Sequence, residues 1–192
     1  MQKASYFVGI DISSKYFTVS IIKNPDNIIA QGIDLSNNIS GFKELEELLE
    51  EYSISKYEVA ICMECTGVYS EKICYYLHQN EYKIYSEQPN KVKKAFDANS
   101  HKTDSVDSRQ IAEYIYRFED KAQLWEPRED ILEEIKTLLN SRELLVKHKT
   151  AATNHLHAIK KKEVLSETAI DTLEENVKEL EEKIDKMENK MD

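Results

Sequence analysis

The chain has 192 residues, 41% of them hydrophobic, which is enough for one core domain and an extension. No apolar stretch reaches the roughly 18 residues of a membrane span, so we expect no membrane partner. Three cysteines make no disulfide framework, and the N-terminus lacks a signal-peptide core, which together indicate the cytoplasm. The formal charge of −10 argues weakly against a nucleic-acid partner, although the distribution of charge matters more than its sum.

Three predicted strands open the chain, at residues 5–12, 16–23 and 28–34, and short turns between them indicate an antiparallel meander. Helical and strand patterns then alternate. The expected elements are a helix from an N-cap at Ser40 to about Tyr52, strand 58–63, helix 68–79, strand 82–86, a brief helix at 89–96, and a helix capped by Thr103 that ends near Phe118.

This order predicts an α/β fold of the ribonuclease H-like (RuvC-like) type, with a mixed five-stranded sheet. Strands 58–63 and 82–86 would run parallel to the first strand through right-handed crossovers. The first strand would lie at the centre of the sheet, with strand 58–63 beside it. We place this domain at residues 1–125 and a helical segment at 126–192.

Four acidic residues stand where carboxylates are unusual. Asp11 ends an apolar run in the first strand, and Glu64 ends another in strand 58–63. Asp104 and Asp107 lie three residues apart on one face of a predicted helix start. If the fold gathers all four, their repulsion calls for a divalent cation, and oxygen ligands favour Mg²⁺ or Mn²⁺. The alternative for the helical pair is simple electrostatics at a helix N-terminus.

Cys62 and Cys65 form a C-x-x-C pair that a zinc ion could use. A zinc site needs a second pair of ligands, and no Cys or His pair with suitable spacing accompanies this one. We therefore interpret these cysteines as small residues that fill a strand end.

Residues 129–192 contain neither Gly nor Pro and carry apolar residues at alternating steps of three and four. From Ile170 this seam reaches Met191, and an earlier seam begins at Ile131. A bend at 160–163 would turn the two parts into an antiparallel helical hairpin, and a dimerising coiled coil is the other interpretation. A single straight helix is the third.

Two stretches are basic within this acidic chain. Residues 136–162 contain seven Lys and Arg residues and one acid. A shorter basic stretch lies within residues 91–102. The positive electrostatic potential of such stretches attracts phosphate groups. The alternative interpretation is that each stretch is simply a solvent-exposed helix face. The candidate nucleic-acid contacts are Lys91, Lys93, Lys94, Lys102, Lys147, Lys149, Lys160 and Lys161.

Three motifs together resemble a known family: Gly-Ile-Asp-Ile-Ser at residues 9–13, Glu-x-Thr-Gly-x-Tyr at 64–69, and Lys-Thr-Asp-x-x-Asp at 102–107. They are similar to the DEDD insertion-sequence transposases, relatives of the Piv DNA invertase with a RuvC-like N-terminal domain. The resemblance extends over about residues 6–160, and the helical continuation also fits.

The resemblance implies that Asp11, Glu64, Asp104 and Asp107 bind divalent metal and take part in DNA strand cleavage and exchange. It also implies a structured bridge RNA as guide, and a homo-oligomer, dimer or tetramer, through the coiled coil. Members of that family continue into a further domain with a nucleophilic serine. We expect this chain to lack that domain, and therefore to be incomplete for recombination by itself.

Other functions remain open at this point. A RuvC-like structure-specific endonuclease would use the same four acids but would not need the long heptad segment. A non-catalytic fragment that binds RNA and dimerises is a second alternative. Sugar-kinase and actin-like ATPases also place an Asp after the first strand, but their phosphate loops need more glycine than the four residues present here.

Overall fold

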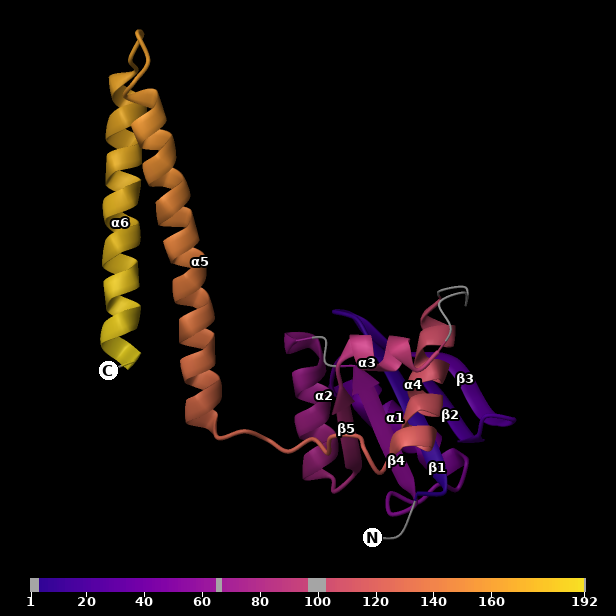
Figure 1. The fold of residues 1–192 in the computed structure, drawn as a ribbon. Helices are drawn as coiled ribbons and strands as arrows, with labels where there is room; N and C mark the ends of the chain where they lie inside the picture. Colours follow the sequence, from indigo (N-terminus) through magenta and orange to yellow (C-terminus); the bar gives the residue numbers. More distant parts are fainter. Residues whose placement is uncertain (1–3, 65–66, 97–102, 192) are drawn as a thin grey trace. The chain divides into compact units, whose positions relative to one another are not determined.

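The computed structural model describes residues 4–64, 67–96 and 103–191. The chain divides into two compact units, Met1–Pro127 and Arg128–Asp192, and each is described by itself. The first unit is built on one five-stranded sheet (Figure 1). Its strands are β1 (Tyr6–Ile12), β2 (Tyr16–Asn24), β3 (Asn27–Ser36), β4 (Val59–Glu64) and β5 (Lys83–Glu87).

The strand order is β3-β2-β1-β4-β5. β1 and β2 are antiparallel, as are β2 and β3, whereas β4 is parallel to β1 and β5 is parallel to β4. This is the ribonuclease H-like arrangement that the order of elements predicts, with β1 central and β4 beside it. The carboxyl ends of the three parallel strands therefore meet at one edge of the sheet.

Helices cover both faces of this sheet (Figure 1). The helices of the first unit are α1 (Ile39–Glu51), α2 (Val68–Gln79), α3 (Pro89–Lys94) and α4 (Asp104–Phe118). Alternate residues of β1 separate the two cores, since Val8 and Ile10 pack with α1 and α2, whereas Phe7 packs with α3 and α4. Gly9 and Asp11, in step with Phe7, therefore belong to the α4 face.

Two helix starts show how local sequence sets their boundaries. Thr103 caps α4 as predicted, because its side chain accepts a hydrogen bond from the Val106 amide. The prediction of Ser40 as the cap of α1 is wrong. Asn38 caps that helix and accepts hydrogen bonds from the amides of Ser40 and Gly41. Asn and Ser are both good N-cap residues. α1 begins at Ile39, directly after Asn38, so Asn38 and not Ser40 occupies the N-cap position.

The second unit consists of α5 (Asp130–Ile159) and α6 (Glu167–Met191), joined by a short turn. Its ion pairs match the start of one helix with the end of the other, namely Glu134–Lys190, Arg142–Glu188, Lys149–Glu181 and Lys160–Glu174. The two helices are thus an antiparallel hairpin, which excludes the single straight helix. None of the described helices has the length and apolar character that a membrane crossing needs.

The predicted seam of α6 faces α5, with Leu180 and Ile184 buried. On α5 the outcome differs along the helix. Leu138 and the later seam residues are partly covered, but Ile131 is 61% exposed and Ile135 is 36% exposed. Ile131 and Ile135, which begin the predicted seam of α5, are therefore not covered by the hairpin.

Candidate functional site

Asp11 and Glu64 lie side by side at the carboxyl edge of the parallel strands. Ile10 pairs with Met63 in the register of β1 and β4, so the next residue on each strand is an acid. Paired residues of neighbouring strands share a face of the sheet, and alternation places both acids on the face that α4 covers. The predicted convergence of the first two acids is therefore built into the strand pairing.

The same row of the sheet holds further polar residues on either side. Asp11 pairs with Thr18 on β2, Thr18 pairs with Asp34 on β3, and Glu64 pairs with Glu87 on β5. Acids thus stand at this level on four of the five strands. Asp34 and Glu87 were missed by reasoning from sequence, because their place in the row depends on register.

The two additional acids have protein partners. The Thr18 hydroxyl donates to Asp34 Oδ1 at 2.6 Å. The side chain of Glu87 is 1% exposed, with Lys91 Nζ at 3.0 Å from one oxygen and the Gln123 amide donating to the other at 3.1 Å. Buried charge is tolerated when it is paired and hydrogen-bonded. Glu87 therefore ties α3 and the segment after α4 to the sheet.

Helix α4 brings the second pair of acids to this edge because it packs very closely on β1. A Cβ atom added to Gly9 would lie 2.0 Å from the Ser108 carbonyl oxygen and 2.3 Å from the Ala112 amide nitrogen. Only glycine leaves room for the helix backbone at this point. The close approach holds the first turns of α4, which carry Asp104 and Asp107, over the carboxyl end of β1.

The electrostatics of the acids show that they share one environment. Burial raises the pKa of Asp11, and the negative charges of Asp107 and Asp104 raise it further. Burial also raises the pKa of Glu64, the positive charge of Lys93 lowers it, and Asp11 and Asp107 raise it. The structure thus places Asp11 within electrostatic range of the other three predicted acids, and Glu64 within range of Asp11 and Asp107.

Asp104 has a partner that the sequence did not reveal. The Tyr16 hydroxyl donates to Asp104 Oδ2 at 3.0 Å, and this hydrogen bond together with the Asp104 charge raises the pKa of Tyr16. Tyr16 is the first residue of β2 and is 42% exposed. A tyrosine at a strand start is common, so the sequence gives no signal for this contact.

A second connection supports the loops around the acids. Asn37, just after β3, donates from Nδ2 to the Ser13 carbonyl oxygen at 2.9 Å and to the Tyr69 carbonyl oxygen at 3.0 Å. The turn that follows Asp11 is thereby joined to the first turn of α2. Thr66 and Cys65, which lie between Glu64 and α2, are outside the described residues.

The donor set suits a hard divalent cation, because carboxylate oxygens are what Mg²⁺ and Mn²⁺ prefer. The negative charges of neighbouring acids also raise the pKa values of Asp11 and Glu64, which is the condition that a bound dication relieves. Among the described residues, however, no group of three or more Asp, Glu, His or Cys already closes on one point as a metal cage. Asp104 in particular is engaged with Tyr16.

The lysines predicted to contact nucleic acid fall into different settings. In the first unit, Lys91 is paired with Glu87, Lys94 is exposed, and Lys93 is exposed within range of Asp11 and Glu64. Lys102 lies outside the described residues.

On α5, the predicted lysines are mostly paired with acids. Lys147 contacts Glu143 at 2.6 Å, Lys149 contacts Glu181 at 2.8 Å, and Lys160 contacts Glu174 at 2.5 Å. Lys161, after the end of α5, is exposed. Two of these acids, Glu181 and Glu174, lie on the acidic helix α6, whereas Glu143 lies on α5 itself.

Comparison with known proteins gives three matches. A transposase family profile, DEDD_Tnp_IS110, matches residues 8–186. The chain is 26% identical over 140 residues to the pilin gene-inverting proteins of Moraxella bovis and Moraxella lacunata, which covers 71% of this chain and 42% of each relative. The chain thus spans less than half the length of these relatives.

One solved structure, T. thermophilus RuvC in complex with a Holliday junction substrate, aligns with a TM-score of 0.47 and 11% identity. That alignment covers 62% of this chain and 99% of the RuvC chain. The profile match takes in both units of the chain, from β1 to the last turns of α6. This chain belongs to the IS110-type DEDD transposase family.

Proposed function

We propose that this chain carries the metal-dependent part of a DNA transposase and takes part in DNA strand cleavage and exchange. One observation carries the proposal: Asp11 and Glu64 end neighbouring parallel strands, and α4 adds Asp104 and Asp107 to the same charged environment. The curated relatives invert a pilin gene, as their name states. Inversion of a DNA segment requires that strands be cut and rejoined.

The proposed roles of the site residues are cation binding for the acids and phosphate contact for Lys93. Asp11, Glu64 and Asp107 would hold Mg²⁺ or Mn²⁺ through their carboxylate oxygens. Asp104, which accepts the Tyr16 hydrogen bond, would be a further ligand or would orient one through a water. When bound, the ion supplies charge stabilisation for the attacking and leaving oxygens of a phosphodiester. Lys93, exposed beside Asp11 and Glu64, would contact the phosphate that approaches them.

The partners follow from the same family membership. We propose DNA as substrate, a structured bridge RNA as guide, a homo-oligomer formed through the helical hairpin, and the cytoplasm as the compartment. The observation that supports an oligomer is the apolar first half of α5, where Ile131, Leu132 and Leu139 are each more than half exposed. The same observation favours the second candidate, a fragment that binds RNA and dimerises without cutting DNA.

A metal titration followed by a cleavage assay separates these functions. Wild-type chain should bind Mn²⁺ and cut branched or nicked DNA with Mg²⁺, and Asp11→Asn should remove both properties. The matched control is Asp26→Asn, which makes the same change in the exposed turn after β2. Absence of both Mn²⁺ binding and cutting, with salt-dependent binding of structured RNA retained, would replace the nuclease with the RNA-binding fragment.

A further inference from the structure

The acid-bearing start of α4 is joined to the antiparallel half of the sheet by hydrogen bonds at three positions. These hydrogen bonds come from β2 and β3, strands that hold neither Asp11 nor Glu64. The three contacts are Tyr16 Oη to Asp104 Oδ2 at 3.0 Å, Gln31 Nε2 to Ser105 Oγ at 3.2 Å, and Ser20 Oγ to Ser108 Oγ at 2.8 Å.

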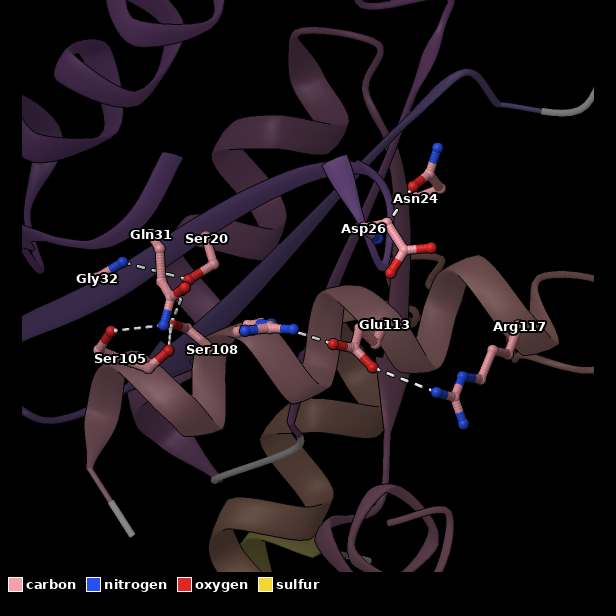
Figure 2. A network of polar contacts seen from close by, with 10 residues as sticks. Ser20, Asn24, Asp26, Gln31, Gly32, Ser105, Ser108, Glu113 and Arg117 are labelled. Atoms are coloured by element: carbon pink, nitrogen blue, oxygen red, sulfur yellow. Dashed lines mark hydrogen bonds and ion pairs between the residues drawn. The ribbon is translucent and has the colours of Figure 1, made fainter. Parts of the chain in front are cut away.

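The serine pair belongs to a hydrogen-bond chain with a defined direction (Figure 2). The Gly32 amide can only donate, and it donates to Ser20 Oγ at 3.2 Å. The Ser105 carbonyl oxygen can only accept, and it accepts from Ser108 Oγ at 3.2 Å. Because each hydroxyl has one proton, Ser20 must donate to Ser108. Ser20 and Ser108 are both 0% exposed, so their hydroxyl groups are shielded from bulk solvent.

Glycine at two positions allows the helix to reach this network. Gly32 has a φ of +72°, and a Cβ there would lie 2.5 Å from Ser105 Oγ. On β1, a Cβ added to Gly9 would likewise clash with the Ser108 carbonyl oxygen. The first two turns of α4 are thus held between two glycine-containing strands, with little freedom to move along the sheet.

A restraint is needed at this point because the acids repel one another. Asp104 and Asp107 act on Asp11 through like charge, which pushes the start of α4 away from β1. Asp104 itself accepts the Tyr16 bond, and Ser105 and Ser108 are the residues that follow each acid. The restraints therefore act at the acids' own positions in the helix.

We propose that Tyr16, Ser20 and Ser108 are positioning residues for Asp104 and Asp107, which hold the two carboxylates at a fixed separation from Asp11 and Glu64 before a cation binds. The inference deepens the proposed function, because a preformed set of ligands binds a cation more tightly than one that must be ordered. Outer residues that orient metal ligands typically change metal affinity by about 10–100-fold.

The test uses Tyr16→Phe and Ser108→Ala in the whole chain, with Tyr76→Phe as the control. Tyr76 loses its hydrogen bond to Glu46 in this variant, on the opposite face of the sheet. Amide hydrogen exchange without metal measures the freedom of the first turns of α4. Mn²⁺ titration measures the affinity of the acids. Both test variants should exchange the amides of residues 106–110 faster and bind Mn²⁺ roughly tenfold more weakly, whereas the control should match the wild type.

The outcomes separate this proposal from the one on which it rests. Unchanged exchange in both test variants overturns the positioning role, whatever the metal result. Faster exchange with unaltered Mn²⁺ affinity also overturns it, because the network then supports only the helix. Wild-type chain that binds no Mn²⁺ contradicts the proposed function, while exchange still decides whether the network holds α4. If Ser108→Ala does not fold, Tyr16→Phe decides, since it removes only a partly exposed hydroxyl.

Discussion

Asp11 illustrates, at the scale of one residue, how a carboxylate placed in the proposed cation site can weaken the fold. Its raised pKa means that the folded protein disfavours the ionised carboxylate. Above that raised pKa the ionised group lowers the free energy of unfolding. The penalty shrinks as the pH falls and is absent below the ordinary value of 3.8, where Asp11 is protonated in both states.

We therefore expect Asp11→Asn to raise the free energy of unfolding at pH 7 without metal, because the neutral amide relieves both burial and repulsion. The gain should disappear as the pH approaches 3.8. Wild-type chain should instead gain about 2.7 kcal/mol from a cation at 100 times its Kd, and the variant should not. Urea unfolding with and without Mn²⁺, at several pH values, measures both effects. A metal-free variant less stable than the wild type at pH 7 contradicts this prediction.

Gly9 is the residue whose lack of a side chain brings α4 to the acids. We expect Gly9→Ala to lower the free energy of unfolding by about 1–3 kcal/mol, the usual cost of overpacking, because the added Cβ meets helix backbone rather than a flexible side chain. It should also weaken Mn²⁺ binding. Gly67→Ala is a useful contrast, since nothing lies within 4 Å of a Cβ there and only its φ of +74° opposes the change. Equal Mn²⁺ affinity in Gly9→Ala and wild type would argue against close packing as the source of the geometry.

At the scale of elements, the hairpin of α5 and α6 is held by a narrow apolar seam with charges on its border. Arg142 and Lys149 interrupt the predicted seam of α5, and in the structure each reaches an acid on α6. Such exposed pairs contribute at most about 1 kcal/mol each. They fix the antiparallel alignment of the two helices, and the apolar seam supplies most of the stability.

Leu180 is buried in that seam, as is Ile184. We expect Leu180→Ala to lower the unfolding free energy of the hairpin by about 2 kcal/mol or more, while the sheet unit keeps its own transition. Val164→Ala provides the control, because Val164 is 86% exposed and its loss should change little. Far-UV circular dichroism during urea unfolding follows the helices. A single transition that shifts as a whole would mean that the two units unfold together.

At the scale of the whole molecule, the division into two units predicts independent folding. Residues 1–127 contain a complete sheet with a core on each face. Trp125 closes this unit, since its amide donates to the Ile84 carbonyl oxygen at 2.8 Å and its ring contacts Tyr75 and His78. We expect residues 1–127 alone to fold with a thermal midpoint close to that of the same unit in the whole chain, measured by Trp125 fluorescence. A molten or aggregated product contradicts this expectation.

Charge also has to be judged on the whole molecule. The basic stretch of α5 predicts nucleic-acid contact when it is considered alone, yet in the hairpin Lys149 and Lys160 are paired with acids of α6. The basic helix α5 and the acidic helix α6, which follow one another in the sequence, become neighbours in the hairpin. Lys93 and Lys94 remain exposed near the acidic edge of the sheet, and they are the better candidates for phosphate contact.

The sequence by itself determined the elements, their order and the first pair of acids. Continuous apolar runs that end in Asp11 and Glu64 are local signals, and the chain order leaves few ways to pair five strands. Thr103 as a helix cap, and the turn between the two long helices, were likewise visible from a few adjacent residues. These features depend on local stereochemistry and hydrophobic periodicity, which a short window of sequence contains.

Only the tertiary structure decided which other groups reach those acids. Asp34 joins the row through a β2–β3 pairing whose register shifts between Val19 and Ile21, and no sequence pattern announces such an irregularity. Tyr16 meets Asp104 across 88 residues of chain. Contacts of this kind depend on how closely α4 packs on Gly9 and Gly32, because side-chain partners are set by the summed geometry of several elements rather than by any one of them.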